Sequence, residues 1–173
     1  MAFVVETGTG SSTATAYVDV TFVDNYFLDR NNIEWVGSTQ QKQAAIIKAT
    51  DYIDLRWGSS FMGRVEFPDT PQALCFPRLN VINKDGRFVT GIPINLKKAT
   101  AEYALRALSI TLLPDPTVDD SGMVVISKKE RVGPIEQSTD FQSSGSAPIL
   151  LRPYPAADKL LQEYVYSIGK NFR

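Results

Sequence analysis

Few residues in this chain have the types and the spacing that catalysis at neutral pH needs. The 173 residues include no histidine and a single cysteine, Cys75. Histidine is the commonest general base and metal ligand near neutral pH, so its absence removes every Ser-His or Cys-His nucleophilic pair. A lone cysteine forms neither an internal disulfide nor a thiolate cluster for zinc. The sequence therefore predicts no enzyme activity, no metal and no cofactor, and we interpret Cys75 as a small core residue.

Two further patterns resemble chemical sites but have simpler interpretations. Gly8-Thr9-Gly10 begins like a phosphate-binding loop, yet the Gly-Lys-Ser/Thr continuation and the helix behind it are missing, which favours an ordinary loop. Asp51 and Asp54 have the i,i+3 spacing of a carboxylate pair on a helix. Because Lys48 and Arg56 lie within one helical turn of them, we expect a solvated, salt-bridged face.

A basic cluster could contact nucleic acid. Lys128, Lys129 and Arg131 follow a predicted strand from Met123 to Ser127, and a second strand is expected around Arg131 to Gln137. The cluster would then lie at the turn of a hairpin. One interpretation is a solvated hairpin tip, and the other is contact with DNA or an acidic partner.

The composition limits the partners that the whole surface could attract. With 18 basic and 19 acidic residues the formal net charge is −1, so any contact with nucleic acid or anionic membrane must be local. No apolar run approaches the ~18 residues of a membrane span, and the first residues lack the features of an export signal. At 43% hydrophobic, the chain is expected to form one soluble, unexported domain with a substantial core.

Three helices are predicted to form that core, and the longest signal runs from Gly91 to Leu113. Pro93 suits a helix start and Pro114 cannot continue it, while apolar residues cover most of the circumference. This pattern predicts a central core helix about 30 Å long, at 1.5 Å per residue. The other two are residues 40–57, capped by Ser38 or Thr39, and a short aromatic helix ending at Leu28, capped by Asp19 or Thr21. We interpret the aromatic residues of the short helix as core packing rather than a base-stacking platform.

The C-terminal part is divided by a polar stretch. Residues 138–148 are expected to be a linker or mobile loop between a core of residues 1–137, with its hairpin at about 123–137, and a segment of residues 149–173. That segment contains a helical pattern from Ala156 to Ile168, which is marginal alone and must find a surface. The alternatives are that it packs back on its own core or that it docks on a neighbouring protein, and we favour docking. The expected anchors are Leu160, Leu161, Tyr164, Ile168 and Phe172, with Lys170 and Arg173 available to acidic groups.

Five segments occur in a fixed order that resembles a known family. They read FVVETGTGSSTATAYVDV, NYF, AAIIKATDYID, QALCFPR and IPINLKKATAEYALRAL, within residues 3–113. Together they resemble a family of tailed-phage proteins often labelled DnaT-like single-stranded DNA-binding, and they are similar to the head-to-tail adaptor (connector) proteins of phage virions. Cys75-Phe76 replaces an acidic residue and tryptophan that are more usual there, while Pro77 and Arg78 match.

The resemblance implies a structural virion protein. It implies a mainly α fold, a helical bundle around the long central helix with a small β-hairpin and an extended C-terminal segment. The implied assembly is a homo-oligomeric ring, a dodecamer, made in the host cytoplasm and placed in the virion between the portal protein and a tail-side stopper or tail terminator protein. Genomic DNA would pass through the lumen without specific binding. From the composition we expect no membrane contact, and from the position of the C-terminal segment after the polar stretch we expect its anchors to meet the portal. The alternatives are a single-stranded DNA-binding protein of phage replication and, with no residue constellation in its favour, an enzyme.

Overall fold

A computed structural model of the chain describes residues 2–66, 71–115, 125–131, 136–141 and 151–166, the two segments between 125 and 141 by their backbone alone. The chain divides into two compact units. Unit 1 contains Met1–Leu112 together with Pro153–Arg173, and unit 2 contains Leu113–Arg152. Among the described residues, no helix combines the length and the apolarity that crossing a bilayer requires.

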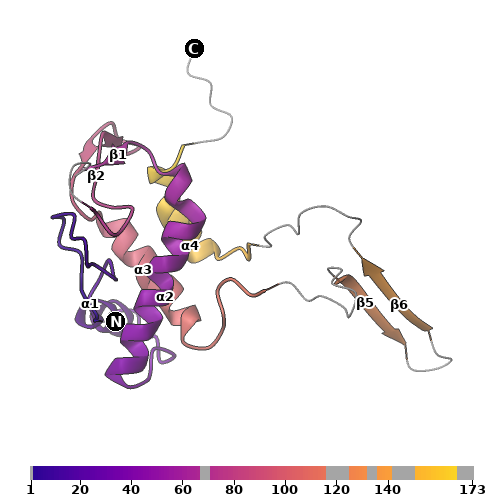
Figure 1. Cartoon of the computed structure of the whole chain (residues 1–173). Helices are drawn as coiled ribbons and strands as arrows, with labels where there is room; N and C mark the ends of the chain where they lie inside the picture. The colour runs from indigo at the N-terminus through magenta and orange to yellow at the C-terminus, as the bar shows by residue number, and fades with distance from the viewer. Residues whose placement is uncertain (1, 67–70, 116–124, 132–135, 142–150, 167–173) are drawn as a thin grey trace, which may run out of the picture. The chain divides into compact units, whose positions relative to one another are not determined.

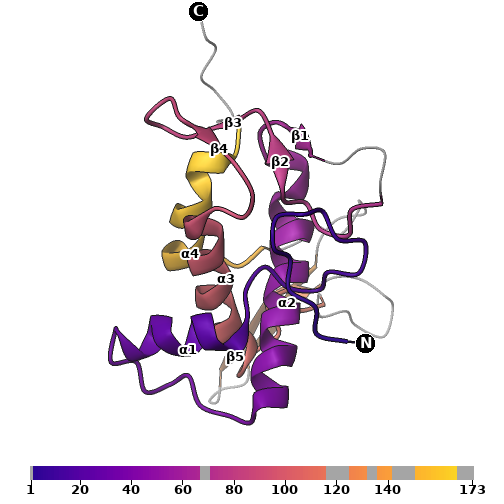
Figure 2. The same cartoon turned by 90° about the vertical axis from the view of Figure 1, so that its left-hand side faces the viewer.

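Unit 1 is built mainly from helices, as expected from the sequence. Its helices are α1 (Val20–Leu28), α2 (Thr39–Trp57), α3 (Ile94–Ala107) and α4 (Pro155–Leu161). In Figure 1 and Figure 2, α2 and α3 lie side by side and α4 lies along α3. Figure 2 shows α1 running across one end of α2 and α3. The regular bundle that we expected is therefore not confirmed, although α3 does contact all three other helices.

The start and the inward face of α2 follow directly from local sequence. Ser38 caps the helix through a reciprocal pair of hydrogen bonds with Gln41, the capping-box arrangement that satisfies two otherwise unpaired backbone N–H groups. Buried residues then recur at helical spacing along the inward face of α2: Ala45, Ile46, Ala49, Thr50, Tyr52 and Ile53. Complete burial of one such aliphatic side chain contributes about 1.5–3 kcal/mol, so this stripe holds α2 in place.

The central helix α3 is shorter than the predicted helix from Gly91 to Leu113. It begins after Pro93, whose backbone is extended, and it ends at Ala107. The N–H groups of Ser109 and Ile110 both bond to the carbonyl of Arg106, which tightens and closes the last turn. The residues before Pro114 include β-branched isoleucine and threonine, which favour helix weakly, and the position before a proline disfavours the helical conformation. Leu112 is nevertheless buried, so the apolar pattern continues after the helix has stopped.

Two small hairpins lie at the end of unit 1 that is opposite α1 (Figure 2). Strand β1 (Arg64–Val65) pairs with β2 (Arg78–Leu79), and β3 (Val81–Ile82) pairs with β4 (Phe88–Val89). The guanidinium of Arg78 donates to the carbonyls of Phe61, Met62, Gly63 and Cys75, which fixes the loop before β1. Gly63 has φ +73°, and a Cβ there would lie 2.0 Å from the carbonyl oxygen of Leu79, so only glycine fits.

Unit 2 contains the predicted hairpin, but with different bounds. Strand β5 (Val125–Arg131) pairs antiparallel with β6 (Glu136–Phe141), and Arg131 is aligned with Glu136. The expected first strand ended at Ser127, and the expected linker began at Ser138. Residues 138–141 instead belong to β6, because their backbone groups complete the ladder with β5. The rest of the expected linker lies outside the described residues.

The C-terminal helix belongs to unit 1, which differs from the expected separate segment of residues 149–173. α4 and the short 3-10 helix after it, Gln162–Tyr164, return to the core. Leu161 and Tyr164 are buried there, and Leu160 is half-buried. The apolar side of this short helix has found a surface on its own chain, so packing back on the core describes these residues. Docking on another protein remains a prediction for the segment.

Candidate binding surfaces

The one thiol of the chain is half-buried and belongs to a hydrogen-bonded cluster that has structural roles. Tyr17 donates its hydroxyl hydrogen to Asp54, which also accepts from the backbone N–H of Cys75 at 3.0 Å. Burial raises the pKa of Asp54 and of Tyr17, and burial together with the nearby Asp54 charge raises the pKa of Cys75 to about 12. The phenol and the thiol therefore stay protonated near neutral pH and are poor nucleophiles. The cluster ties the N-terminal segment and the loop at Cys75 to α2.

The interpretation of Asp51 and Asp54 as a solvated, salt-bridged face is wrong for Asp54 and for Arg56. Asp54 bonds to Tyr17 as described, and Arg56 forms an ion pair with Asp158 of α4 at 2.8 Å. Both side chains point toward segments far away in the sequence. The spacing of charged residues along α2 could not predict these contacts, because the partners are brought together by tertiary packing.

The Gly8-Thr9-Gly10 segment is a loop that closes on a carboxylate of its own chain. Glu6 is almost completely buried, and its oxygens accept from the backbone N–H groups of Gly8, Thr9, Gly10 and Ser11 at 2.8 to 3.1 Å. Successive N–H groups of this kind form a concave anion site. Because Glu6 already accepts from these four N–H groups, they are not available to a phosphate, and the prediction of an ordinary loop is confirmed.

A second carboxylate, Asp158, joins α4 to α2 and α3. It accepts from the Tyr103 hydroxyl at 2.5 Å and from the backbone N–H of Tyr154 at 3.0 Å, in addition to its ion pair with Arg56. Burial and the bond to Asp158 raise the pKa of Tyr103 well above its ordinary value. This Asp158 cluster is enclosed, with about an eighth of each charged side chain exposed.

The residues predicted to contact partners do not form one described surface in the structure. Leu161 and Tyr164 lie in the core of unit 1, whereas Ile168, Lys170, Phe172 and Arg173 lie outside the described residues. Lys128, Lys129 and Arg131 belong to strand β5 rather than to the hairpin turn, and Arg131 is its last residue. Nothing in the structure tests whether any of the ten predicted contact residues, the half-buried Leu160 included, meets a partner.

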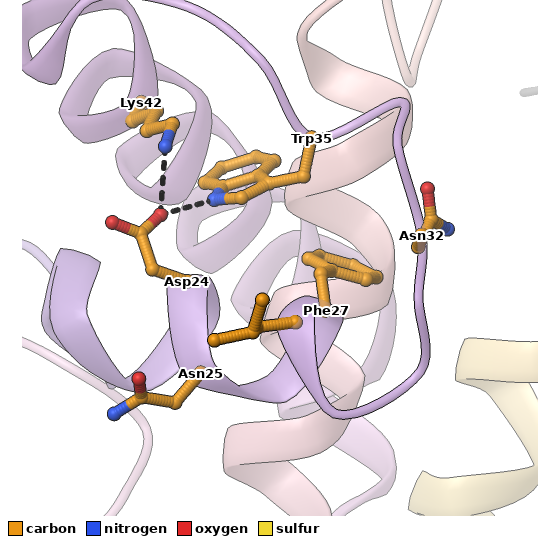
Figure 3. Close-up of a pocket in the computed structure, with 7 residues that line it drawn as sticks. Asp24, Asn25, Phe27, Asn32, Trp35 and Lys42 are labelled. Carbon is orange, nitrogen blue, oxygen red and sulfur yellow. Dashed lines mark hydrogen bonds and ion pairs between the residues drawn. The ribbon is translucent and has the colours of Figure 1, made fainter.

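A pocket that sequence reasoning missed lies where α1, α2 and their connecting loop meet. Its volume is about 230 Å³, and its lining consists of Asp24, Asn25, Phe27, Leu28, Asn32, Trp35 and Lys42. Figure 3 shows the carboxylate of Asp24 between the Trp35 indole and the Lys42 ammonium. The indole N–H donates to Asp24 at 2.6 Å and the ammonium donates to the same oxygen at 2.8 Å. We call this the Trp35 pocket.

Three large aliphatic side chains near this pocket face solvent. Leu28, Ile33 and Val36 are 77%, 83% and 71% exposed; Leu28 is the last residue of α1, and the other two lie in the loop between α1 and α2. We call these three residues the loop surface. Single exposed aliphatic residues are common, but a concentration of them marks an interaction site. Aliphatic side chains cannot stack on bases in the way that exposed aromatic residues do, so their chemistry suits a protein partner.

The β3–β4 hairpin carries a different chemistry. Phe88 is 70% exposed, and the exposed cations Lys84 and Arg87 precede it in the same hairpin. The turn is held by the side chain of Asn83, which accepts from the backbone N–H groups of Asp85 and Arg87. We call Lys84, Arg87 and Phe88 the hairpin surface. Its sequence signal was present, since Asp85-Gly86 lies within the five residues between two apolar pairs, a pattern typical of a hairpin with a longer loop.

Comparison with known proteins gives one result. A family model described as "Putative DnaT-like ssDNA binding protein" matches residues 1–173. The chain belongs to this DnaT-like family. No curated protein and no solved structure matches the chain. Membership of the DnaT-like family agrees with the resemblance seen in the sequence, and its description names DNA binding rather than a virion adaptor. Among the described residues, no group of three or more potential ligands could hold a metal ion.

Proposed function

We propose that the chain is a structural assembly protein, a head-to-tail adaptor of a tailed phage. It would form a ring, expected to be a dodecamer, between the portal protein and a tail-side stopper or tail terminator protein in the virion. Genomic DNA would pass through the lumen of this ring without specific binding. The observation that carries the proposal is the loop surface, where three aliphatic side chains remain more than two thirds exposed. Burying them against protein would be favourable, at roughly 25 cal/mol per Å² of apolar area.

Electron microscopy of the purified protein with and without the portal tests this proposal. The wild-type protein is expected to add a ring to the portal, and the double variant Ile33→Glu, Val36→Glu is expected to leave the portal bare. Leu55→Glu is the matched control, because Leu55 is also an exposed aliphatic residue but lies on α2 outside the loop surface. Wild-type protein that never joins the portal would overturn the adaptor proposal. Normal assembly by the double variant would show that the loop surface is not the interface.

The second candidate is a single-stranded DNA-binding protein, and the family description favours it over the adaptor. The hairpin surface supports it too, because proteins that bind single strands combine cations for the phosphates with exposed aromatic rings for the bases. Against it stand the net charge of −1 and the burial of most aromatic rings among the described residues. One exposed phenylalanine with two cations is a small platform for such binding.

Fluorescence anisotropy with labelled oligothymidylate separates the two candidates. If the adaptor proposal holds, binding at physiological salt is weak and has no defined site size. Tight binding that falls steeply with salt would favour the DNA-binding candidate. Two triple variants then locate the site: Lys84→Ala, Arg87→Ala, Phe88→Ala in the β3–β4 hairpin, and Lys128→Ala, Lys129→Ala, Arg131→Ala in β5.

A further inference from the structure

The Trp35 pocket has the size of a single side chain. Its volume of about 230 Å³ lies below the ~300–1,000 Å³ typical of pockets for drug-sized ligands. It is also several times the ~30 Å³ that one water molecule occupies in the liquid. Phe27, Leu28 and Trp35 supply apolar lining, while Asp24, Asn25 and Asn32 supply polar groups. An occupant should therefore combine an apolar stem with a polar end.

The hydrogen bonds of Asp24 show which polar end would fit. Both the Trp35 indole and the Lys42 ammonium donate to Oδ1 of Asp24. Within the described part of the chain no donor bonds to Oδ2, and the Asp24 side chain remains 44% exposed. An ionised carboxylate offers about four acceptor positions on its two oxygens. The group that the pocket lacks is therefore a hydrogen-bond donor, and a charged donor bonds a carboxylate most strongly.

The other charges around the pocket leave room for a further cation. The ammonium of Lys42 balances the charge of Asp24. Asp29 and Glu34 add two negative charges to the loop that connects α1 to α2. The guanidinium of Arg30 lies 3.6 Å from the centre of the Tyr26 ring and donates to the Tyr26 carbonyl, so it is already engaged on α1. The ammonium of Lys42 lies 5.6 Å from the centre of the Trp35 ring, which shows that this indole accepts a cation beside it.

We propose that the Trp35 pocket receives an arginine side chain from a protein partner. Its guanidinium would donate to Oδ2 of Asp24, and its aliphatic stem would lie against Leu28, the exposed apolar residue of the pocket lining. Aliphatic residues that flank the arginine would cover Leu28, Ile33 and Val36 of the loop surface. This inference rests on the proposed function, in which a protein covers the loop surface, and it specifies the chemistry of that partner. Arginine suits the site better than lysine, because its planar fork matches the geometry of a carboxylate.

The two tryptophans of the chain make the proposal directly testable by NMR. The indole N–H of Trp35 bonds to Asp24 in the pocket, whereas that of Trp57 bonds to the Tyr103 hydroxyl in the core. The blocked peptide Leu-Arg-Leu is titrated into the labelled full-length protein, with Leu-Gln-Leu as the matched peptide. We expect a saturable shift of the Trp35 indole signal alone, with affinity at least about tenfold higher for the arginine peptide.

Two variants complete the experiment. Asp24→Asn can still accept from Trp35 but lacks the charge, and it is expected to abolish the preference for arginine. Asp29→Asn removes a charge just after α1, outside the pocket lining, and should keep the preference. Equal binding of both peptides, the absence of a Trp35 shift, or equal shifts of both tryptophans would overturn the inference. These outcomes are independent of the portal experiment, so failure of the pocket and failure of the adaptor proposal can be told apart.

Discussion

Asp158 and Asp24 are two carboxylates with similar partners and very different surroundings. Each meets one cation and one aromatic donor: Arg56 and Tyr103 for Asp158, and Lys42 and Trp35 for Asp24. Asp158 uses both of its oxygens and is enclosed by α2, α3 and α4, whereas both donors to Asp24 share one oxygen and nearly half of that side chain is exposed. A buried carboxylate with all its partners joins elements, while an exposed one with an unused oxygen is available for recognition.

The largest effect is expected when the enclosed carboxylate loses its cation. Arg56→Ala leaves the negative charge of Asp158 in the core without its ion pair, which should lower the free energy of unfolding by about 3–5 kcal/mol. Urea denaturation followed by circular dichroism measures this loss, and hydrogen exchange should show that α4 opens most readily. A loss below about 1 kcal/mol is the size expected of a solvent-exposed ion pair, and it would contradict the enclosed character of the Asp158 cluster.

Burial raises the pKa of the Cys75 thiol, so this thiol should react slowly with alkylating reagents. A rise in pKa from 9.0 to about 12 lowers the thiolate fraction near pH 8 about a thousandfold, so iodoacetamide should alkylate the native protein about a thousandfold more slowly than the urea-unfolded chain. The folded state holds this proton more tightly than the unfolded state does. The stabilisation is therefore complete below pH 9 and is lost as the pH rises from 9 toward 12.

Comparison with Cys75→Ser isolates this contribution from the tyrosines, which titrate in both proteins. The wild-type protein should lose more stability than the serine variant when unfolding is measured at pH 8 and again at pH 10.5. Equal losses in the two proteins, or rapid alkylation of the native thiol, would contradict the enclosed environment.

Truncation of Leu161 tests whether α4 belongs to the core. Leu161→Ala should cost about 3 kcal/mol, in the range of about 2–5 kcal/mol for buried leucines, because the side chain is fully buried. Leu160→Ala is the adjacent control and should cost less, since Leu160 is only half-buried. Thermal unfolding of both variants measures the difference. If Leu161→Ala unfolds like wild type but fails to join the portal, α4 acts as the docking segment that the sequence suggested.

The smallest effect is expected at the exposed carboxylate. Lys42→Ala removes the cation of Asp24 but leaves that carboxylate in contact with solvent, so the cost should stay below about 1 kcal/mol. Urea denaturation beside Arg56→Ala gives the comparison directly. A cost close to that of Arg56→Ala would mean that the Trp35 pocket is part of the structural core and not a recognition site.

Local sequence was sufficient to predict the helices and several of their ends. Ser38 with Gln41, Asp19 at the start of α1, and the apolar spacing of α2 and α3 all act within one or two turns of the residue concerned. The loop at Gly8 was also predictable, because a phosphate site needs a longer pattern than the chain contains. The absence of histidine and the single cysteine also limited the catalytic and metal-binding sites that we could consider from the sequence.

The sequence contains a turn signal for the β3–β4 hairpin that we did not use to predict this hairpin. Asp85-Gly86 lies within the five residues that separate two apolar pairs, so the turn could be predicted from neighbouring residues alone. The end of α3 was harder to predict, because the apolar pattern runs on to Leu112 while the backbone has already left the helix at Ala107. Burial and helix are separate properties, and a periodic pattern reports the first more directly than the second.

By itself, then, the sequence determined the mainly helical class, the caps and inward faces of α1, α2 and α3, and membership of the DnaT-like family. The tertiary structure decided which charged groups meet. Asp54 bonds to Tyr17 and Cys75, Arg56 meets Asp158, and Glu6 closes its own loop. It also decided that α4 packs on its own chain and that the Trp35 pocket exists. The physical reason is that capping and periodicity act between residues a few positions apart, whereas burial of a charge depends on what the rest of the chain brings beside it.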